Sequence, residues 1–99
     1  MTTIYLPEAE AEMHEAAQFY ENERKQLGNR FYDVISRALE DIELHPRKSP
    51  QVRNAVRRRL LPKFPYAILY LIHHDEVVVV AVAHLHRDPL YWLERLESL

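Results

Sequence analysis

The amino-acid sequence predicts an α+β domain: an N-terminal strand, an antiparallel helical hairpin packed on a small, largely antiparallel sheet of about four strands, and a short C-terminal helix. Two observations indicate this class. Residues 8–45 contain two stretches whose apolar side chains recur at helical spacing. After residue 51 the pattern changes to short apolar runs, including YAILYLI at 66–72 and VVVVAVA at 77–83. Because 99 residues support one hydrophobic core, we expect residues 1–99 to form a single domain.

Residues 2–6 form the predicted N-terminal strand, because threonine, isoleucine, tyrosine and leucine follow one another until Pro7. Proline suits the first position of a helix, so a helix is expected to begin there. Its opening turns carry Glu8, Glu10 and Glu12, where the helix macrodipole favours negative charge. Its apolar face consists of Ala9, Met13, Ala16, Ala17 and Tyr20.

Gly28, the only glycine, is expected to end the first helix in a left-handed conformation, and Asn29 to cap the second helix. The second helix is expected to close at His45, before Pro46. The short connection predicts an antiparallel pair. Its apolar face consists of Phe31, Ile35, Ala38, Leu39 and Ile42.

The remaining chain reads as strands followed by a helix. Residues 52–61 are expected to form one strand, and residues 66–72 and 77–83 a hairpin buried on both faces or central in the sheet. Alternation along a strand places at least one of Arg57, Arg58 and Arg59 on each face. A last helix is expected to start with Asp88 as cap and Pro89 at its first position, with Leu90, Leu93 and Leu96 on its apolar side.

Composition excludes several functional classes. The chain has no cysteine, so it can form no disulfide, thiolate metal site or cysteine nucleophile. No apolar stretch approaches the roughly 20 residues of a membrane span, and the N-terminus lacks the pattern of a signal peptide. We therefore expect a cytoplasmic protein with no membrane partner.

The charge is distributed unevenly along the chain. Residues 1–45 carry ten acidic and four basic side chains, a net charge of −6, whereas residues 46–99 carry nine basic and five acidic ones, a net charge of +4. Such a split suits a polyanionic or acidic partner on one face. Ordinary solvated faces also explain this split, and charge alone favours that interpretation.

No phosphate-binding glycine loop or serine nucleophile elbow is present. His84 and His86 are two residues apart and project to the same side of the chain, but without a carboxylate in register they are a weak zinc pattern. We therefore expect no metal and no cofactor.

A cationic and aromatic rim follows the last strand: it comprises His84, His86, Arg87, Tyr91, Trp92 and Arg95. These residue types can bind a phosphodiester and supply proton transfer for metal-independent RNA cleavage. They can also be structural, with Trp92 packed under the sheet, Arg95 paired with Asp88 or Glu94, and the histidines satisfied locally. Residue types alone favour the structural interpretation, because aromatic side chains at helical spacing usually report packing.

Three segments closely resemble the ParE/RelE superfamily of bacterial type II toxins, in its plasmid-stabilisation group: FPYAILYLI (64–72), DEVVVVAVAH (75–84) and HRDPLYWLER (86–95). With the element order, the resemblance covers essentially the whole chain. It implies a growth-arresting toxin encoded beside a cognate antitoxin, whose tail wraps the toxin and silences it in a hetero-oligomeric complex.

The resemblance implies one of two activities. RelE-like members cut mRNA on the ribosome with Arg, Lys, Tyr or His side chains, whereas ParE-like members inhibit DNA gyrase. In RelE-like nucleases an arginine usually follows the first tyrosine of a Y-x-x-x-Y strand, but here Ala67 follows Tyr66. The His-Tyr or Tyr ending of several nucleases is also absent. We therefore expect a ParE-like gyrase inhibitor.

Two alternatives stay open: a RelE-like ribosome-dependent endoribonuclease using His84, His86, Arg87 and Tyr91, and a decayed toxin that only binds its antitoxin. For target binding we expect a basic edge and part of the rim. These residues are Arg57, Arg58, Arg59 and Lys63, with Arg87, Trp92 and Arg95. The antitoxin is expected to contribute acidic side chains where this chain is basic, in a groove that accepts an amphipathic helix or an added strand.

Overall fold

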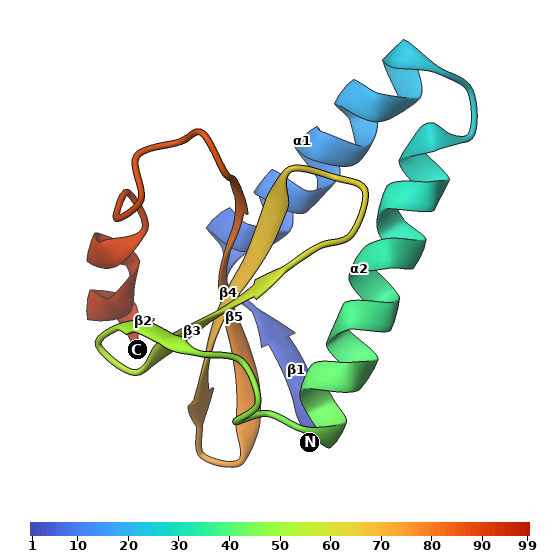
Figure 1. Ribbon diagram of the computed structural model, residues 1–99. Coiled ribbons are helices and arrows are strands. Elements are labelled where there is room, and N and C mark those ends of the chain that lie inside the picture. The colour runs from blue at the N-terminus through green and yellow to red at the C-terminus, as the bar shows by residue number, and fades with distance from the viewer.

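The computed structural model describes residues 1–99 as a five-stranded sheet with a helical hairpin on one side and the C-terminal segment on the other (Figure 1). The elements are β1 (Thr2–Tyr5), α1 (Pro7–Glu23), α2 (Leu27–Leu44), β2 (Gln51–Arg53), β3 (Val56–Leu60), β4 (Tyr66–His73), β5 (Glu76–His84) and the 3₁₀ helix η1 (Leu93–Ser98). The predicted α+β class, N-terminal strand and helical hairpin are confirmed.

The strand order is β1-β5-β4-β3-β2, with β1 parallel to β5 and the other neighbours antiparallel. The two central strands, β4 and β5, are covered from both sides, which is why their sequences are nearly continuous apolar runs. The expectation of a central, doubly buried hairpin is therefore confirmed.

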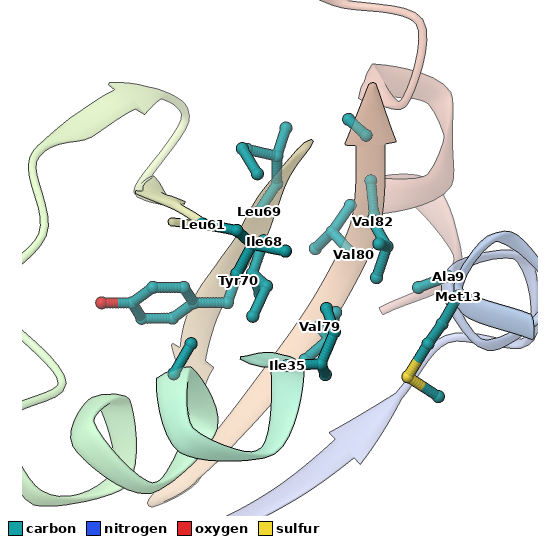
Figure 2. Close-up of a cluster of buried hydrophobic side chains, with 14 of the residues drawn as sticks. Ala9, Met13, Ile35, Leu61, Ile68, Leu69, Tyr70, Val79, Val80 and Val82 are labelled. Carbon is teal, nitrogen blue, oxygen red and sulfur yellow. The ribbon is translucent and has the colours of Figure 1, made fainter. Parts of the chain in front are cut away.

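One hydrophobic core joins the sheet to the hairpin. Ala9 and Met13 of α1 and Ile35 of α2 share one buried cluster with Val79 of β5 and Ile68 of β4, and Ile35 lies beside Val79 (Figure 2). Tyr70 is fully buried, and its hydroxyl donates to the carbonyl oxygen of Pro46 at 2.8 Å. The core thereby fixes the loop that follows α2.

The prediction of a single strand over residues 52–61 is wrong, because this segment forms two strands, β2 and β3. Asn54 and Ala55 both take positive φ, at 49° and 67°, the combination that closes a two-residue hairpin. The sheet therefore has five strands where about four were expected.

The predicted helix boundary at Gly28 is also wrong. α1 ends at Glu23, Gln26 takes the left-handed conformation with φ 74°, and Gly28 lies in the first turn of α2. A Cβ atom on Gly28 would lie 2.7 Å from the carbonyl oxygen of Ala17, so glycine is needed there for close approach of the two helices. Asn29 accordingly follows the start of α2 and does not cap it.

The last helix begins later than expected and is a 3₁₀ helix. Turns occupy the segment around Asp88 and Pro89, and Oδ1 of Asp88 accepts a hydrogen bond from the backbone NH of Leu90 at 3.2 Å. Trp92 is fully buried, and its indole NH donates to the carbonyl oxygen of Pro89 at 3.0 Å. Insertion of this indole into the core explains why the chain turns here before a helix forms.

No helix is both long and apolar enough to cross a membrane.

Candidate functional site

The three consecutive arginines of β3 lie on different faces of the sheet, as alternation predicts. Arg57 donates to the carbonyl oxygens of Arg47 and Ser49, at 3.0 and 2.7 Å, and Arg59 pairs with Asp41 of α2. Arg58 lies on the opposite face, without an ion pair. Of the three, only Arg58 keeps its guanidinium free for a partner.

Arg58 lines a cavity of about 200 Å³ on the face that carries the C-terminal segment. We call this cavity the Arg58 pocket. Its floor consists of Ala67, Leu69 and Ala83, and its rim of Arg58, His84, Leu85, Arg87, Asp88, Pro89 and Tyr91. The structure thus brings Arg58 of the predicted basic edge together with His84, Arg87 and Tyr91 of the predicted rim.

Beside this pocket, one carboxylate accepts hydrogen bonds from several side chains of the C-terminal segment. Glu12 of α1 accepts hydrogen bonds from Nη1 and Nη2 of Arg95, at 2.9 and 2.8 Å, and from the hydroxyl of Tyr91, at 2.6 Å. Nη1 of Arg87 lies 3.4 Å from the same carboxylate, and its guanidinium stacks 3.7 Å from the centroid of the Tyr91 ring. We call these four residues the Glu12 cluster.

Burial and hydrogen bonding have opposite effects on the pKa of Glu12, whose side chain is 12% exposed. Burial alone would raise its pKa, but the hydrogen bonds from Arg95 and Tyr91 outweigh it, and the net pKa lies below the ordinary value. Burial and the nearby Glu12 carboxylate strongly raise the pKa of Tyr91, while the hydrogen bond to Glu12 raises that of Arg95. Glu12 is therefore ionised at neutral pH, and Tyr91 keeps its proton.

The Glu12 cluster also covers an open edge of the sheet. β1 pairs with β5 only as far as Val79. Beyond that point Oε1 of Glu12 accepts from the backbone NH of Val82 at 3.1 Å, and Nη1 of Arg95 donates to the carbonyl oxygen of Val80 at 3.0 Å. Two side chains thus make the hydrogen bonds that a neighbouring strand would make.

The other predicted site residues have different surroundings. The Nδ1 of His84 accepts a hydrogen bond from the backbone NH of His86 at 3.1 Å, and the rings of the two histidines are 5.1 Å apart. Trp92 is fully buried, so it supports the site from within the core. Lys63 lies apart from the Arg58 pocket, at a second cavity on the helical side of the sheet.

Sequence reasoning assigned Glu12 to the opening turns of the helix for its charge alone and missed its role in the site. The expected pairing of Arg95 with Asp88 or Glu94 is wrong, because Arg95 pairs with Glu12. The signal was its position: Glu12 follows Ala9 by three residues and precedes Ala16 by four, both on the apolar face. A carboxylate at helical spacing within an apolar stripe requires a buried cationic partner.

A solved structure has a similar architecture. The chain is similar to a chain titled "Chromosomal ParDE TA system from P. aeruginosa", with a TM-score of 0.64, 12% identity, and coverage of 87% of this chain and 97% of that chain. The chain therefore has the α+β fold of that ParDE toxin–antitoxin chain.

The family described as "ParE toxin of type II toxin-antitoxin system, parDE" matches residues 3–89. The chain belongs to this ParE toxin family, and the recognition made from the sequence is confirmed. No curated protein matches the sequence.

Proposed function

We propose that this chain is a ParE-like toxin that arrests growth by inhibiting DNA gyrase through the surface around the Arg58 pocket, and that a cognate antitoxin neutralises it. Family membership supports a toxin role. The observation that favours inhibition by binding over RNA cleavage is the set of contacts made by Glu12.

Metal-independent RNA cleavage needs a group that can take a proton and cations that are free to hold the phosphate. The hydroxyl of Tyr91 donates a hydrogen bond to Glu12, and three N–H groups of Arg95 donate to Glu12 and to the carbonyl oxygen of Val80. The Nδ1 of His84 is occupied by a backbone NH. The ionised Glu12 would also repel a phosphodiester brought to this place.

Arg58 and Arg87 stay available to a protein partner. Arg58 forms no ion pair, and the side chain of Arg87 is 54% exposed. Arginine is the cation best suited to paired hydrogen bonds with carboxylates at an interface. The pocket between them accepts one or two side chains of the target.

A ribosome-dependent nuclease is the second candidate. The presence of Arg58, His84 and Arg87 around one pocket favours it, because three nitrogen-bearing side chains converge there. In that case His86, which is exposed and whose ring makes no hydrogen bond, is the residue left to act as general base.

Supercoiling of relaxed plasmid by gyrase, and mRNA integrity in a translating extract, test these functions with the purified chain freed of its antitoxin. We expect the wild-type chain to inhibit supercoiling and leave mRNA intact. The double variant Arg58→Ala/Arg87→Ala should require about tenfold more protein for the same inhibition, if each arginine contributes about 0.7 kcal/mol to the interface.

The charge-matched control is Lys25→Ala/Arg53→Ala, which removes two exposed cations outside both cavities and should inhibit like the wild type. Cutting of mRNA with normal supercoiling would replace the gyrase proposal by the nuclease. Inactivity in both assays would favour a chain that only binds an antitoxin.

A further inference from the structure

Basic side chains are concentrated in one segment of the chain. Residues 46–63 contain seven basic side chains and no acidic one, whereas the rest of the chain contains six basic and 15 acidic ones. The segment comprises the loop after α2, the β2–β3 hairpin and the turn before β4. Positive charge concentrated in this way attracts polyanions, even though the net charge of the whole chain is −2.

Four of these cations lie together where α2 ends, on the helical side of the sheet. Lys48 and Arg59 both pair with Asp41 of α2, and Arg57 donates to the carbonyl oxygen of Arg47 at 3.0 Å. Asp41 is the one carboxylate that pairs with them, so the five residues together carry a net charge of +3. We call Arg47, Lys48, Arg57 and Arg59 the basic loop surface.

An open cleft of about 520 Å³ lies at this surface. Its lining contains no carboxylate and consists of His45, Pro46, Arg47 and Lys48. Glu43, in the last turn of α2, accepts a hydrogen bond from the hydroxyl of Thr3 in β1 and does not line the cleft. The side chain of Lys48 is 63% exposed despite its ion pair. The cleft can therefore admit an anion without displacing an acidic group.

The backbone of this loop turns its carbonyl oxygens toward the protein. Those of Arg47 and Ser49 accept from Arg57, at 3.0 and 2.7 Å. That of Pro46 accepts from the hydroxyl of the buried Tyr70 at 2.8 Å, which holds the loop to the core. The partial negative charges of the loop thus point inward, and a preformed site loses little conformational entropy when a ligand binds.

We infer that the basic loop surface binds the sugar–phosphate backbone of duplex DNA, without reading its sequence. This inference goes beyond the proposed function and does not depend on it. Contacts of lysine and arginine with phosphates supply essentially all of the affinity in non-specific DNA binding, and they need no apolar anchor.

The composition of the cleft favours duplex DNA over other polyanions. A single strand is bound by stacking its bases on aromatic side chains, and no phenylalanine, tyrosine or tryptophan lines the cleft. An acidic peptide is anchored by large side chains in a pocket, and Pro46 is the only apolar side chain of the lining. A rigid polyanion with evenly spaced charges needs only the cations that this surface presents.

The basic loop surface and the Arg58 pocket lie on opposite faces of the sheet, because Arg57 and Arg59 alternate with Arg58 along β3. DNA binding and the proposed gyrase contact therefore use different side chains. Substitutions can separate the two.

The test compares Arg47→Ala/Lys48→Ala with the control Arg24→Ala/Lys25→Ala. Both changes remove an exposed arginine and the exposed lysine that follows it, but the control lies in the connection between α1 and α2, at the other end of α2 (Figure 1). Arg58→Ala/Arg87→Ala, at the Arg58 pocket, is a second control.

Binding of the full chain to a short fluorescein-labelled duplex of arbitrary sequence is measured by fluorescence anisotropy over a range of salt concentrations. Gyrase is absent, so the result does not depend on the gyrase target. The same titrations are made with single-stranded DNA and with polyglutamate. Circular dichroism confirms that each variant is folded.

We expect Arg47→Ala/Lys48→Ala to bind the duplex roughly tenfold more weakly at low salt. The slope of log affinity against log salt concentration should become shallower by about 1.8, the value for two phosphate contacts. Both controls should bind like the wild type, and equal weakening by either control would overturn the inference. So would a wild-type chain that does not bind the duplex, or that binds single-stranded DNA or polyglutamate as tightly.

Discussion

Replacement of Glu12 by alanine should destabilise this chain more than any other substitution of an acidic residue. The change removes the partner of Arg95, whose side chain is 14% exposed, and also unpairs the hydroxyl of Tyr91 and the backbone NH of Val82. Removing one member of a buried ion pair costs about 3–5 kcal/mol. Because both members keep some contact with solvent, we take the lower limit, about 3 kcal/mol.

A loss of about 3 kcal/mol lowers the melting temperature of a domain of this size by roughly 12–24 °C. Urea denaturation measures the free energy directly, and its slope should be unchanged, because the surface exposed on unfolding is the same. Glu15→Ala is the matched control, because Glu15 lies three residues further along α1 and is exposed. We expect its free energy of unfolding to change by less than about 0.5 kcal/mol.

A double-mutant cycle with Arg95→Ala isolates the contribution of the pair. If Glu12 and Arg95 act together, the double variant should be about as unstable as Glu12→Ala alone, with a coupling energy above about 1.5 kcal/mol. A Glu12→Ala variant within 1 kcal/mol of Glu15→Ala would refute the view that this carboxylate holds the C-terminal segment.

Three further predictions concern stability. The pKa of Glu12 is lowered on folding, so its contribution to the free energy of unfolding is complete above the unfolded pKa near 4.5 and is lost as the pH falls through the lower folded value. Between pH 6 and pH 2 the melting temperature of Glu12→Gln should therefore fall less than that of the wild type. Gly28→Ala should destabilise by about 1–3 kcal/mol despite the higher helix propensity of alanine, because the new Cβ meets the carbonyl oxygen of Ala17 at 2.7 Å; an increased melting temperature would contradict this reading. Tyr91→Phe removes a hydroxyl that donates to a carboxylate and should cost about 1.5–3 kcal/mol in urea denaturation, whereas a change near zero would indicate that Glu12 is equally well satisfied by water.

The sequence predicted the elements that follow from periodicity. The central hairpin was predictable because a strand covered on both faces must be apolar at every position, as Val77–Ala83 is. The division of the three arginines between the faces followed from the alternation of strand side chains. These are local rules, and they hold wherever a segment is regular.

What the sequence could not predict depends on contacts between distant segments. A lone glycine such as Gly28 is typical of a helix end, but here the close approach of α1 requires a glycine inside α2. The C-terminal segment has the pattern of a helix start at Asp88, yet burial of Trp92 determines where the chain turns. Glu12 and Arg95 are 83 residues apart, so no local rule pairs them.

The edges of the sheet determine how this chain meets other chains. At one edge β2 has only three residues and an irregular register. At the other edge β1 has only four residues, and the part of β5 that β1 leaves uncovered is occupied by Glu12 and Arg95. Neither edge offers the long, flat row of free backbone groups on which a foreign strand, or another copy of the same chain, can stack into fibrils. The chain overproduced alone should therefore stay dispersed, and loss of the Glu12–Arg95 pair should make it prone to aggregate.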